Sequence, residues 1–338
     1  MSKATTVKLK DLAMELGLSI STISRALNGN GRVSEKTRER VFQAVKRSNY
    51  TPNAVARSLR KQNAMSIGII VTDITNSFFA SVIKGVQNVS RQKGYSILLS
   101  NSDENEQFEK EAMQLMLEKQ VTGLILASVG NNAKKIEMFS MHRVPVVFID
   151  NIPSGLTGYD SVTTDNYQAA HALTDMLIHK GYRHIGMITG PLNQSSGLQR
   201  YKGFAASMAE HGLQINPDWI KEGDFKLSSG AEAMTEILNL GEQDQPQAMI
   251  VSNNYMTYGA VRAIKAKGRS IPKDIAVVSF DTEDITSLTT LAITSMNQAS
   301  EEIGTKAAEV LISRMQSPDA HPHVNLVLEP VFVEGNSW

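Results

Sequence analysis

The chain has 338 residues, 41% of them hydrophobic, and its 34 Lys and Arg balance 34 Asp and Glu to a formal net charge of zero. This length and composition are typical of a soluble α/β protein with two or three domains. The absence of Cys from the sequence excludes disulfides, thiolate metal sites and thiol catalysis. The N-terminus lacks the apolar stretch of a secretory signal, and no run approaches the roughly 20 apolar residues that cross a bilayer. We therefore expect a cytoplasmic protein with no membrane partner.

The charge is distributed unevenly along the chain. The first 62 residues carry 13 Lys and Arg against four Asp and Glu, a net charge of +9, so the remaining 276 residues carry −9. A basic segment joined to an acidic one is most simply interpreted as two functional parts, one of which meets a polyanion. The alternative interpretation is that the basic residues form only a solvated helical surface.

Three short amphipathic helices are predicted within the basic segment. Leu9–Leu16 places its Leu and Ala side chains on one face, and Gly17 supplies the left-handed turn that ends the helix. Ser19 is the predicted N-cap of a second helix, Ile20–Asn28, and a third helix follows Ser34. Three helices around a tight turn indicate a helix-turn-helix unit.

The second predicted helix leaves small side chains and one Arg outside the helical core. Ile23, Ala26 and Leu27 face inward, and the other positions lie at the helix start or on its outer face: Ile20, Ser21, Thr22, Ser24 and Arg25. A guanidinium can pair with guanine O6 and N7, so Arg25 is the best candidate for direct base reading. Its alternative role is a phosphate contact.

Three ordered motifs carry a resemblance to a known family. Residues 7–28 read VKLKDLAMELGLSISTISRALN, residues 33–38 read VSEKTR, and residues 49–59 read NYTPNAVARSL. This chain resembles the lactose/galactose repressor (LacI/GalR) family of bacterial transcriptional regulators. The resemblance implies a homodimer that binds a pseudo-palindromic double-stranded DNA operator, with an all-α helix-turn-helix head at residues 1–51 whose second helix enters the major groove.

The resemblance also implies the residues that contact DNA. Ile20, Ser21 and Arg25 match base-reading positions. The full predicted DNA-binding set is Ser19, Ile20, Ser21, Thr22, Ser24, Arg25, Asn28, Tyr50, Ala56, Arg57, Leu59 and Arg60.

Residues 52–63 are predicted to form a hinge helix rather than a plain tether, because they lack the Gly and Ser of a flexible linker and Pro52 suits a first helical turn. In the resembled family the hinge pairs with its dimer mate in the minor groove, and Leu59 matches the Leu that wedges a base step open. Arg57, Arg60 and Lys61 would flank that wedge. Alternatively, Leu59 packs on the core domain.

From Met65 onward, short apolar runs alternate with helix-length segments, which predicts parallel sheets covered on both faces. The predicted strands are Ser66–Val71, Ser96–Ser100, Gly123–Ala127, Val144–Ile149, His184–Thr189, Ala248–Val251, Ile275–Ser279 and Asn325–Leu328, with a helix at Ser300–Met315. The resemblance implies a two-lobed, periplasmic-binding-protein-like α/β core at residues 64–338. The first lobe is expected at about 64–158 and 294–320, and the second at about 159–293 and 321–338.

The sequence shows none of the catalytic motifs we considered: no Gly-rich Lys-Ser/Thr phosphate loop, no His-Glu-x-x-His and no Gly-x-Ser-x-Gly. The seven His are scattered. We therefore predict neither an enzyme nor a metal site, and no cofactor apart from a small-molecule effector.

The effector is expected at loops that follow the strands, where open α/β sheets bind small molecules. Position after a strand and the family resemblance together give the predicted effector-binding set: Asp73, Phe78, Phe79, Asp150, Gln194, Ser196, Arg200, Phe225, Asn253 and Asp281. In the resembled family Arg200 matches a ligand-gripping Arg and Asp281 matches an acid that accepts ligand hydroxyls. The family often shows Asn-Asp where this chain has Asn253-Asn254, which leaves Asn254 out of the set.

The sequence as a whole predicts a ligand-responsive repressor of carbohydrate uptake or breakdown genes, with a sugar or sugar derivative as effector. The sign of the response, induction or co-repression, is left open. One alternative is a regulator of the same family controlled by a protein partner of the phosphocarrier type. Another is a solute-binding protein without DNA activity. The absence of a leucine-heptad tail after the last strand favours a dimer over a tetramer.

Overall fold

The structure is a computed structural model that describes residues 9–28, 33–48, 66–130, 132–282, 290–318 and 322–338. The chain divides into two compact units, Met1–Ala64 and Met65–Trp338, and each is described by itself. None of the helices in the described part of the chain is long and apolar enough to span a bilayer.

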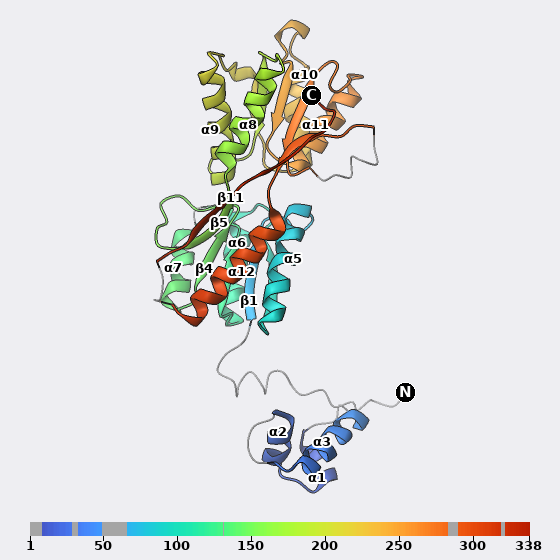
Figure 1. Ribbon diagram of the computed structural model, residues 1–338, viewed down its shortest axis with the longest axis vertical. Helices are drawn as coiled ribbons and strands as arrows, with labels where there is room; N and C mark the ends of the chain where they lie inside the picture. Colours follow the sequence, from blue (N-terminus) through green and yellow to red (C-terminus); the bar gives the residue numbers. More distant parts are fainter. Residues whose placement is uncertain (1–8, 29–32, 49–65, 131, 283–289, 319–321) are drawn as a thin grey trace. The chain divides into compact units, whose positions relative to one another are not determined.

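The first unit contains three helices in its described residues (Figure 1): α1 Leu9–Leu16, α2 Ile20–Asn28 and α3 Glu35–Ser48. Fully buried apolar side chains from all three helices form the centre of the unit, namely Leu12, Ile23, Val41 and Ala44. The helices predicted from the sequence are therefore confirmed, with α3 beginning one residue after Ser34. The predicted hinge at 52–63 lies outside the described residues.

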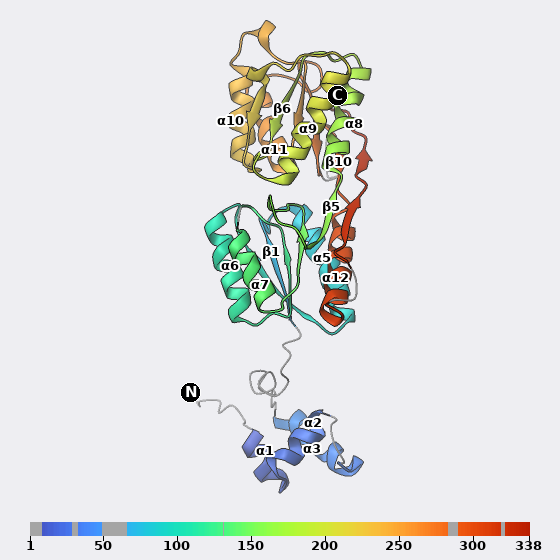
Figure 2. The ribbon, with the colours of Figure 1, turned by 90° about the vertical axis from the view of Figure 1, so that its left-hand side faces the viewer.

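The first lobe of the second unit is a six-stranded, wholly parallel sheet in the order β11-β5-β4-β3-β1-β2. Its strands are β1 Ser66–Val71, β2 Ser96–Asn101, β3 Gly123–Leu126, β4 Val146–Ile149, β5 Asp160–Thr164 and β11 Asn325–Leu328. Its helices are α5 Ser77–Gln92, α6 Glu106–Glu118, α7 Ala133–Met141 and α12 Ser300–Gln316. One face packs against α5 and α12 and the other against α6 and α7 (Figure 2).

The second lobe is a six-stranded sheet in the order β12-β10-β9-β8-β6-β7, parallel except that β12 runs antiparallel to β10. Its strands are β6 Ile185–Thr189, β7 Ile220–Glu222, β8 Ala248–Val251, β9 Ala276–Phe280, β10 Thr294–Asn297 and β12 Val331–Val333. Its helices are α8 Asn166–His179, α9 Ser195–Glu210, α10 Leu227–Leu238 and α11 Asn254–Ala266, with short 3-10 turns at Pro217–Trp219 and Glu242–Asp244. The α8 and α9 helices cover one face and α10 and α11 the other.

The eight strands predicted from the sequence are all present, each within two residues of its expected bounds. Several of them, including β1, β6 and β8, are buried nearly throughout because helices cover both faces of each sheet. The fold predicted from the sequence, a helical head and a two-lobed α/β core with parallel sheets, is confirmed.

The expected lobe boundaries were wrong at three crossovers. The strand β5 belongs to the first lobe, so the chain first enters the second lobe after Thr164 rather than at residue 159. The chain returns to the first lobe after β10, which belongs to the second lobe and not the first. It crosses once more between β11, in the first lobe, and β12. Both β5 and β10 are rich in Thr and Ser, and this composition concealed them from an apolar pattern.

Candidate functional site

The turn between α1 and α2 is a Schellman motif centred on Gly17. Gly17 has φ of +62°, its N–H donates to the Met14 carbonyl at 3.4 Å, and the Leu18 N–H donates to the Ala13 carbonyl at 3.1 Å. A Cβ at this position meets nothing within 4 Å. Glycine is therefore required by the backbone conformation alone, and this turn fixes where α2 begins.

The start of α2 is capped by Ser19, as its sequence predicts. The Ser19 hydroxyl accepts a hydrogen bond from the Thr22 N–H at 3.0 Å, and it lies 2.8 Å from each of the Ser21 and Thr22 hydroxyls. The cap satisfies a free N–H of the first helical turn and holds these hydroxyls together at one end of the helix.

The outer face of α2 carries the side chains predicted to read DNA. Ile20 is 44% exposed, Ser21 and Arg25 are exposed, and Thr22 and Ser24 are half-buried. Of the remaining predicted DNA-contact residues, Asn28 ends α2 with its side chain undescribed. The others lie outside the described residues: Tyr50, Ala56, Arg57, Leu59 and Arg60.

The basic residues of α3 do not all point outward. Lys36, Arg40 and Lys46 are exposed, and the Arg40 guanidinium donates to the Leu16 carbonyl at 3.3 Å. Arg38 is half-buried, with its Nε atom buried and without a hydrogen-bond partner in the described part of the chain. Arg38 therefore contributes to packing as well as to the charge of the first unit.

A pocket lies between the two lobes of the second unit, at the carboxyl ends of strands from both sheets. It encloses about 530 Å³ of space between protein atoms, part of it open to solvent. The lining residues are Thr72, Asp73, Asn76, Phe78, Phe79, Asp103, Glu104, Asp150, Ser196, Arg200, Phe225, Lys226, Asn253, Asn254, Asp281 and Gln298. Nine of the ten predicted effector-binding residues are thus brought together.

Gln194 is the predicted residue that does not line the pocket. Its side-chain amide donates to Glu104 at 3.0 Å and accepts from Asn151 at 2.8 Å, so both ends are engaged by the first lobe. Asn151 also accepts the Ser196 N–H at 2.9 Å. Gln194 therefore bridges the lobes beside the pocket instead of facing into it.

A second bridge explains a departure from the family pattern. The Asn76 and Asn254 side chains, from different lobes, exchange two amide hydrogen bonds of 3.0 Å. An Asp at position 254 could accept from Asn76 but could not donate in return. Asn254 thus lines the pocket and joins the lobes, and the Tyr255 hydroxyl adds a bond of 2.6 Å to the Thr75 carbonyl.

Arg200 is anchored from several sides and is only 2% exposed. Its Nε donates to Asn166 at 2.7 Å, its Nη1 donates to the Ser252 carbonyl, and its guanidinium lies 4.3 Å from the centre of the Phe280 ring. Its Nη2 is 3.8 Å from Asp281. Burial lowers the pKa of Arg200, and the neighbouring carboxylates oppose that shift. The Arg200 guanidinium is therefore held in one orientation, with its Nη2 directed toward the acidic side chains of the pocket.

Several carboxyl groups share this pocket with Arg200. Burial, together with the nearby Glu104 and Asp281 carboxylates, outweighs the lowering effect of Arg200 and raises the pKa of Asp150 to about 7. Burial also raises the pKa of Glu104. Asp281 accepts both the main-chain and the side-chain N–H of Gln298, at 2.8 and 2.9 Å. The pocket therefore presents mainly hydrogen-bond acceptors, and one of its acids is held close to half-protonation at neutral pH.

Backbone strain is concentrated at the pocket. Of the seven described non-glycine residues with positive φ, five line it: Asp103 (52°), Glu104 (54°), Asp150 (58°), Phe225 (65°) and Asp281 (57°). Such conformations cost on the order of 1–3 kcal/mol each for side chains that do not favour them, and they persist where the surrounding structure holds them in place. The Phe225 ring occupies space that a side chain at Gly190 would fill.

Some of the pocket was missed from the sequence. Asp103 and Glu104 follow β2, so the rule that places ligands after strands could have included them. Gln298 follows β10, a strand whose polar sequence concealed it. The other unpredicted lining residues are Thr72, Asn76, Lys226 and Asn254.

Comparisons with known proteins match both units. Residues 8–53 match the bacterial regulatory proteins of the lacI family, and residues 64–332 match the periplasmic binding proteins and sugar binding domain of the LacI family. The chain belongs to the LacI family. As a LacI-family member, it is a DNA-binding regulator of transcription.

Two curated relatives match nearly the whole length of this chain. The transcriptional repressor PurR of Aliivibrio fischeri (strain MJ11) is 31% identical over 330 residues, 97% of this chain and 97% of PurR. Catabolite control protein A of Priestia megaterium is 33% identical over 310 residues, 91% of this chain and 92% of that protein.

Solved structures match as well. The lac repressor dimer bound to operator and the anti-inducer ONPF has a TM-score of 0.84 at 26% identity, covering 98% of this chain and 99% of the repressor. The CelR–cellobiose complex has a TM-score of 0.74 at 26% identity, covering 98% and 100%.

Proposed function

We propose that this LacI-family regulator is a homodimeric repressor of genes for the uptake or breakdown of a carbohydrate. It binds a pseudo-palindromic operator through two copies of α2, and a small molecule in the cleft of the second unit controls that binding. The sugar-binding description of the family matched by residues 64–332, and the cellobiose bound by CelR, support a carbohydrate effector.

The exposed face of α2 supports the DNA-binding part of the proposal. Ile20, Ser21 and Arg25 lie on one outward surface beside the Ser19 cap, which is the arrangement a recognition helix needs in the major groove. The surrounding Lys and Arg neutralise phosphates, so affinity should fall steeply with salt. Selection of random DNA by the purified protein tests this part, and a symmetric, gapped consensus is expected. Enrichment of no sequence would contradict it.

The charge of the cleft is the observation that carries the effector assignment. Its lining includes five acidic side chains against Arg200 and Lys226. The side-chain oxygen of Gln298, a residue that is 9% exposed, is buried without a hydrogen-bond partner in the described part of the chain. A ligand that fits must supply N–H or O–H donors and must not bring further negative charge. A neutral polyhydroxylated molecule meets both conditions.

The aromatic residues of the cleft favour a sugar but also admit a second candidate. Phe78 and Phe79 lie edge to face, with ring centres 4.8 Å apart, and Phe225 lines the pocket with them. Such rings cover the apolar face of a pyranose, yet they would equally stack on a flat base. Because several relatives are named PurR, a purine is the second candidate effector.

The relative position of the two lobes would control DNA binding. A ligand that holds the lobes together through both walls of the cleft changes the surfaces they present to the dimer partner, and with them the pairing of the two hinges on DNA. A ligand shifts such an equilibrium only by its different affinity for the two states. The same architecture is therefore compatible with either induction or co-repression by the ligand.

A thermal-shift panel tests the effector assignment. It contains neutral sugars, their phosphates, sugar acids, nucleobases and nucleosides. A ligand at 100 times its Kd should stabilise the protein by about 2.7 kcal/mol. We expect hits among the neutral sugars, lost in Arg200→Ala and Asp281→Asn and retained in Arg262→Ala, which removes an exposed Arg on α11.

Other outcomes of the panel have definite meanings. Hits confined to purines would replace the carbohydrate by the second candidate. Hits confined to phosphates and acids would contradict the charge argument. Silence across the panel would indicate control by a protein partner of the phosphocarrier type instead of a bound small molecule.

A further inference from the structure

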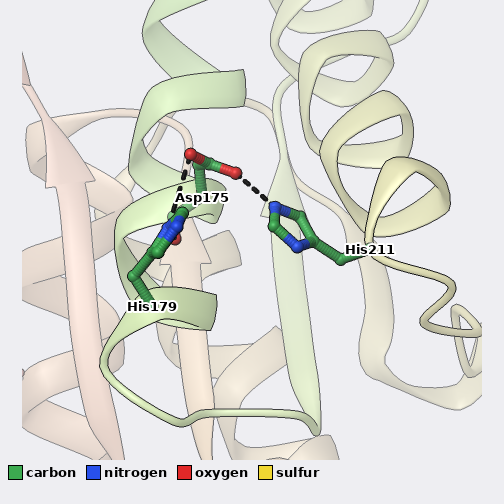
Figure 3. A group of neighbouring side chains, drawn as sticks. All are labelled: Asp175, His179 and His211. Carbon is green, nitrogen blue, oxygen red and sulfur yellow. Dashed lines mark hydrogen bonds and ion pairs between the residues drawn. The ribbon is translucent and has the colours of Figure 1, made fainter.

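A cluster of two imidazoles and a carboxylate lies at the C-terminal ends of α8 and α9 (Figure 3). Asp175 and His179 are one helical turn apart on α8, and His211 is the C-cap residue of α9. The His211 Nε2 lies 2.5 Å from one oxygen of Asp175, and the His179 Nδ1 lies 3.5 Å from the other. One potential ligand atom from each residue lies within 4.8 Å of the other two.

We propose that Asp175, His179 and His211 bind a divalent transition-metal ion of the zinc type. Bonds from zinc to imidazole nitrogen and carboxylate oxygen are about 2.0–2.2 Å long, so tetrahedral ligand atoms stand about 3.3 Å apart. The three ligand atoms lie within 4.8 Å of one another, and the His179 Nδ1 is also 2.8 Å from the main-chain carbonyl oxygen of Asp175. Binding an ion therefore requires side-chain rotation, above all of the His179 ring, to bring the three atoms to about 3.3 Å from one another.

The ligand set indicates which ions the site selects. Two imidazoles with one carboxylate suit Zn²⁺, Co²⁺, Ni²⁺ or Cu²⁺, whereas Mg²⁺ and Ca²⁺ prefer an all-oxygen shell. Three protein ligands leave a fourth position for water. His179 is exposed on 69% of its side chain, so an ion reaches the site directly from solvent and the ring can turn to present either nitrogen.

The close packing of α8 against α9 holds this cluster in place. Gly203 of α9 lies against the Tyr167 carbonyl of α8 so closely that a Cβ would collide with it, which fixes the separation of the two helices. At their N-terminal ends the same helices hold the Arg200–Asn166 bond of the effector pocket. Because α8 has 14 residues and is therefore about 20 Å long, the ion would stabilise the second lobe without entering the pocket.

A neighbouring pair supplies a matched control. His171 of α8 and Glu210 of α9 also join the two helices, with His171 Nε2 2.9 Å from the Glu210 carboxylate. His171→Ala removes one His and one interhelical contact from the same helix pair, outside the three-ligand cluster. It therefore separates the loss of a metal ligand from the loss of an ordinary contact.

The test is calorimetric titration of the chelator-treated, full-length protein, without a histidine tag, with Zn²⁺, Co²⁺ and Mg²⁺. We expect one Zn²⁺ per chain with a Kd in the micromolar range, a metal-dependent rise in Tm, visible Co²⁺ absorption of nitrogen–oxygen coordination, and no Mg²⁺ response. His179→Ala, which keeps the Asp175–His211 contact, and His211→Ala should each weaken Zn²⁺ binding at least tenfold. His171→Ala should bind as the unaltered chain does.

Two results would overturn the proposal. One is a wild-type protein that binds no Zn²⁺, which would leave the cluster as an ion pair between two helices. The other is unchanged Zn²⁺ affinity and stoichiometry in both His179→Ala and His211→Ala, which would place the ion elsewhere on the surface.

Discussion

Replacing Asp150 by Asn should change how stability depends on pH. Burial, with Glu104 and Asp281 nearby, raises the pKa of Asp150 from 3.8 to about 7. Between those two values the folded protein binds more protons than the unfolded chain, so the free energy of unfolding falls as pH rises through this range. One unit of pKa corresponds to about 1.4 kcal/mol, which gives a loss of about 2–3 kcal/mol between pH 5 and pH 8. Asn at position 150 removes this loss.

Urea unfolding of both proteins from pH 5 to pH 9 measures the effect. The difference in unfolding free energy between Asp150→Asn and the wild type should grow by about 2–3 kcal/mol up to pH 8 and stay level above it. Asp218→Asn, at an exposed carboxylate in the turn before β7, should show no such growth. A pH-independent difference for Asp150→Asn would refute the view that Asp150 is ionised against the cost of burial.

Three further substitutions test other parts of the molecule. Gly17→Ala should destabilise the first unit by about 1–2 kcal/mol, because Ala at φ of +62° is strained. Faster hydrogen exchange of the α1 amides in the full chain would show this destabilisation, and an unchanged exchange rate would contradict it. Arg25→Ala should cost about 1–3 kcal/mol of preference for the selected operator over random DNA. An equal loss on both DNAs would assign Arg25 to a phosphate. Asp160 is buried, which alone would raise its pKa, but hydrogen bonds from Arg314 and the Val324 N–H outweigh burial and lower it. Asp160→Asn should therefore unfold more readily at pH 7, and its deficit should shrink as pH falls below about 4, where the wild type loses the same stabilisation. A constant deficit would contradict that cause.

Local sequence chemistry predicted most of the fold. The helix-turn-helix follows from Gly17, which must be left-handed, and from Ser19, whose hydroxyl caps α2. The buried strands follow from unbroken apolar runs, as in β1 and β8.

The parts that the sequence did not reveal depend on contacts between distant residues. β5 is a strand because β4 and β11 pair with it and because Arg314, 154 residues away, binds Asp160, and none of this appears in its Asp-Ser-Val-Thr-Thr sequence. Gln194 was assigned to the pocket because it lies in the loop after the strand that ends at Thr189, but Asn151 and Glu104 determine where its amide points.

The pocket shows the same division between local and distant information. Position after a strand and the family resemblance together predicted nine of its lining residues, Arg200 and Asp281 among them. The pairing of Asn76 with Asn254 and the raised pKa of Asp150 arise only when the two lobes meet. Their roles in binding a ligand remain predictions.

We propose that a small molecule in the cleft of the second unit controls how tightly the first unit binds DNA. The most direct test of this proposal is a fluorescence-anisotropy titration of the selected operator with the full-length protein, without and with the ligand found by thermal shift. Allosteric coupling of about 1–3 kcal/mol should change the Kd for the operator about 5- to 150-fold, and Arg200→Ala should bind the operator with no ligand effect. An operator Kd that is the same with and without saturating ligand would contradict the account.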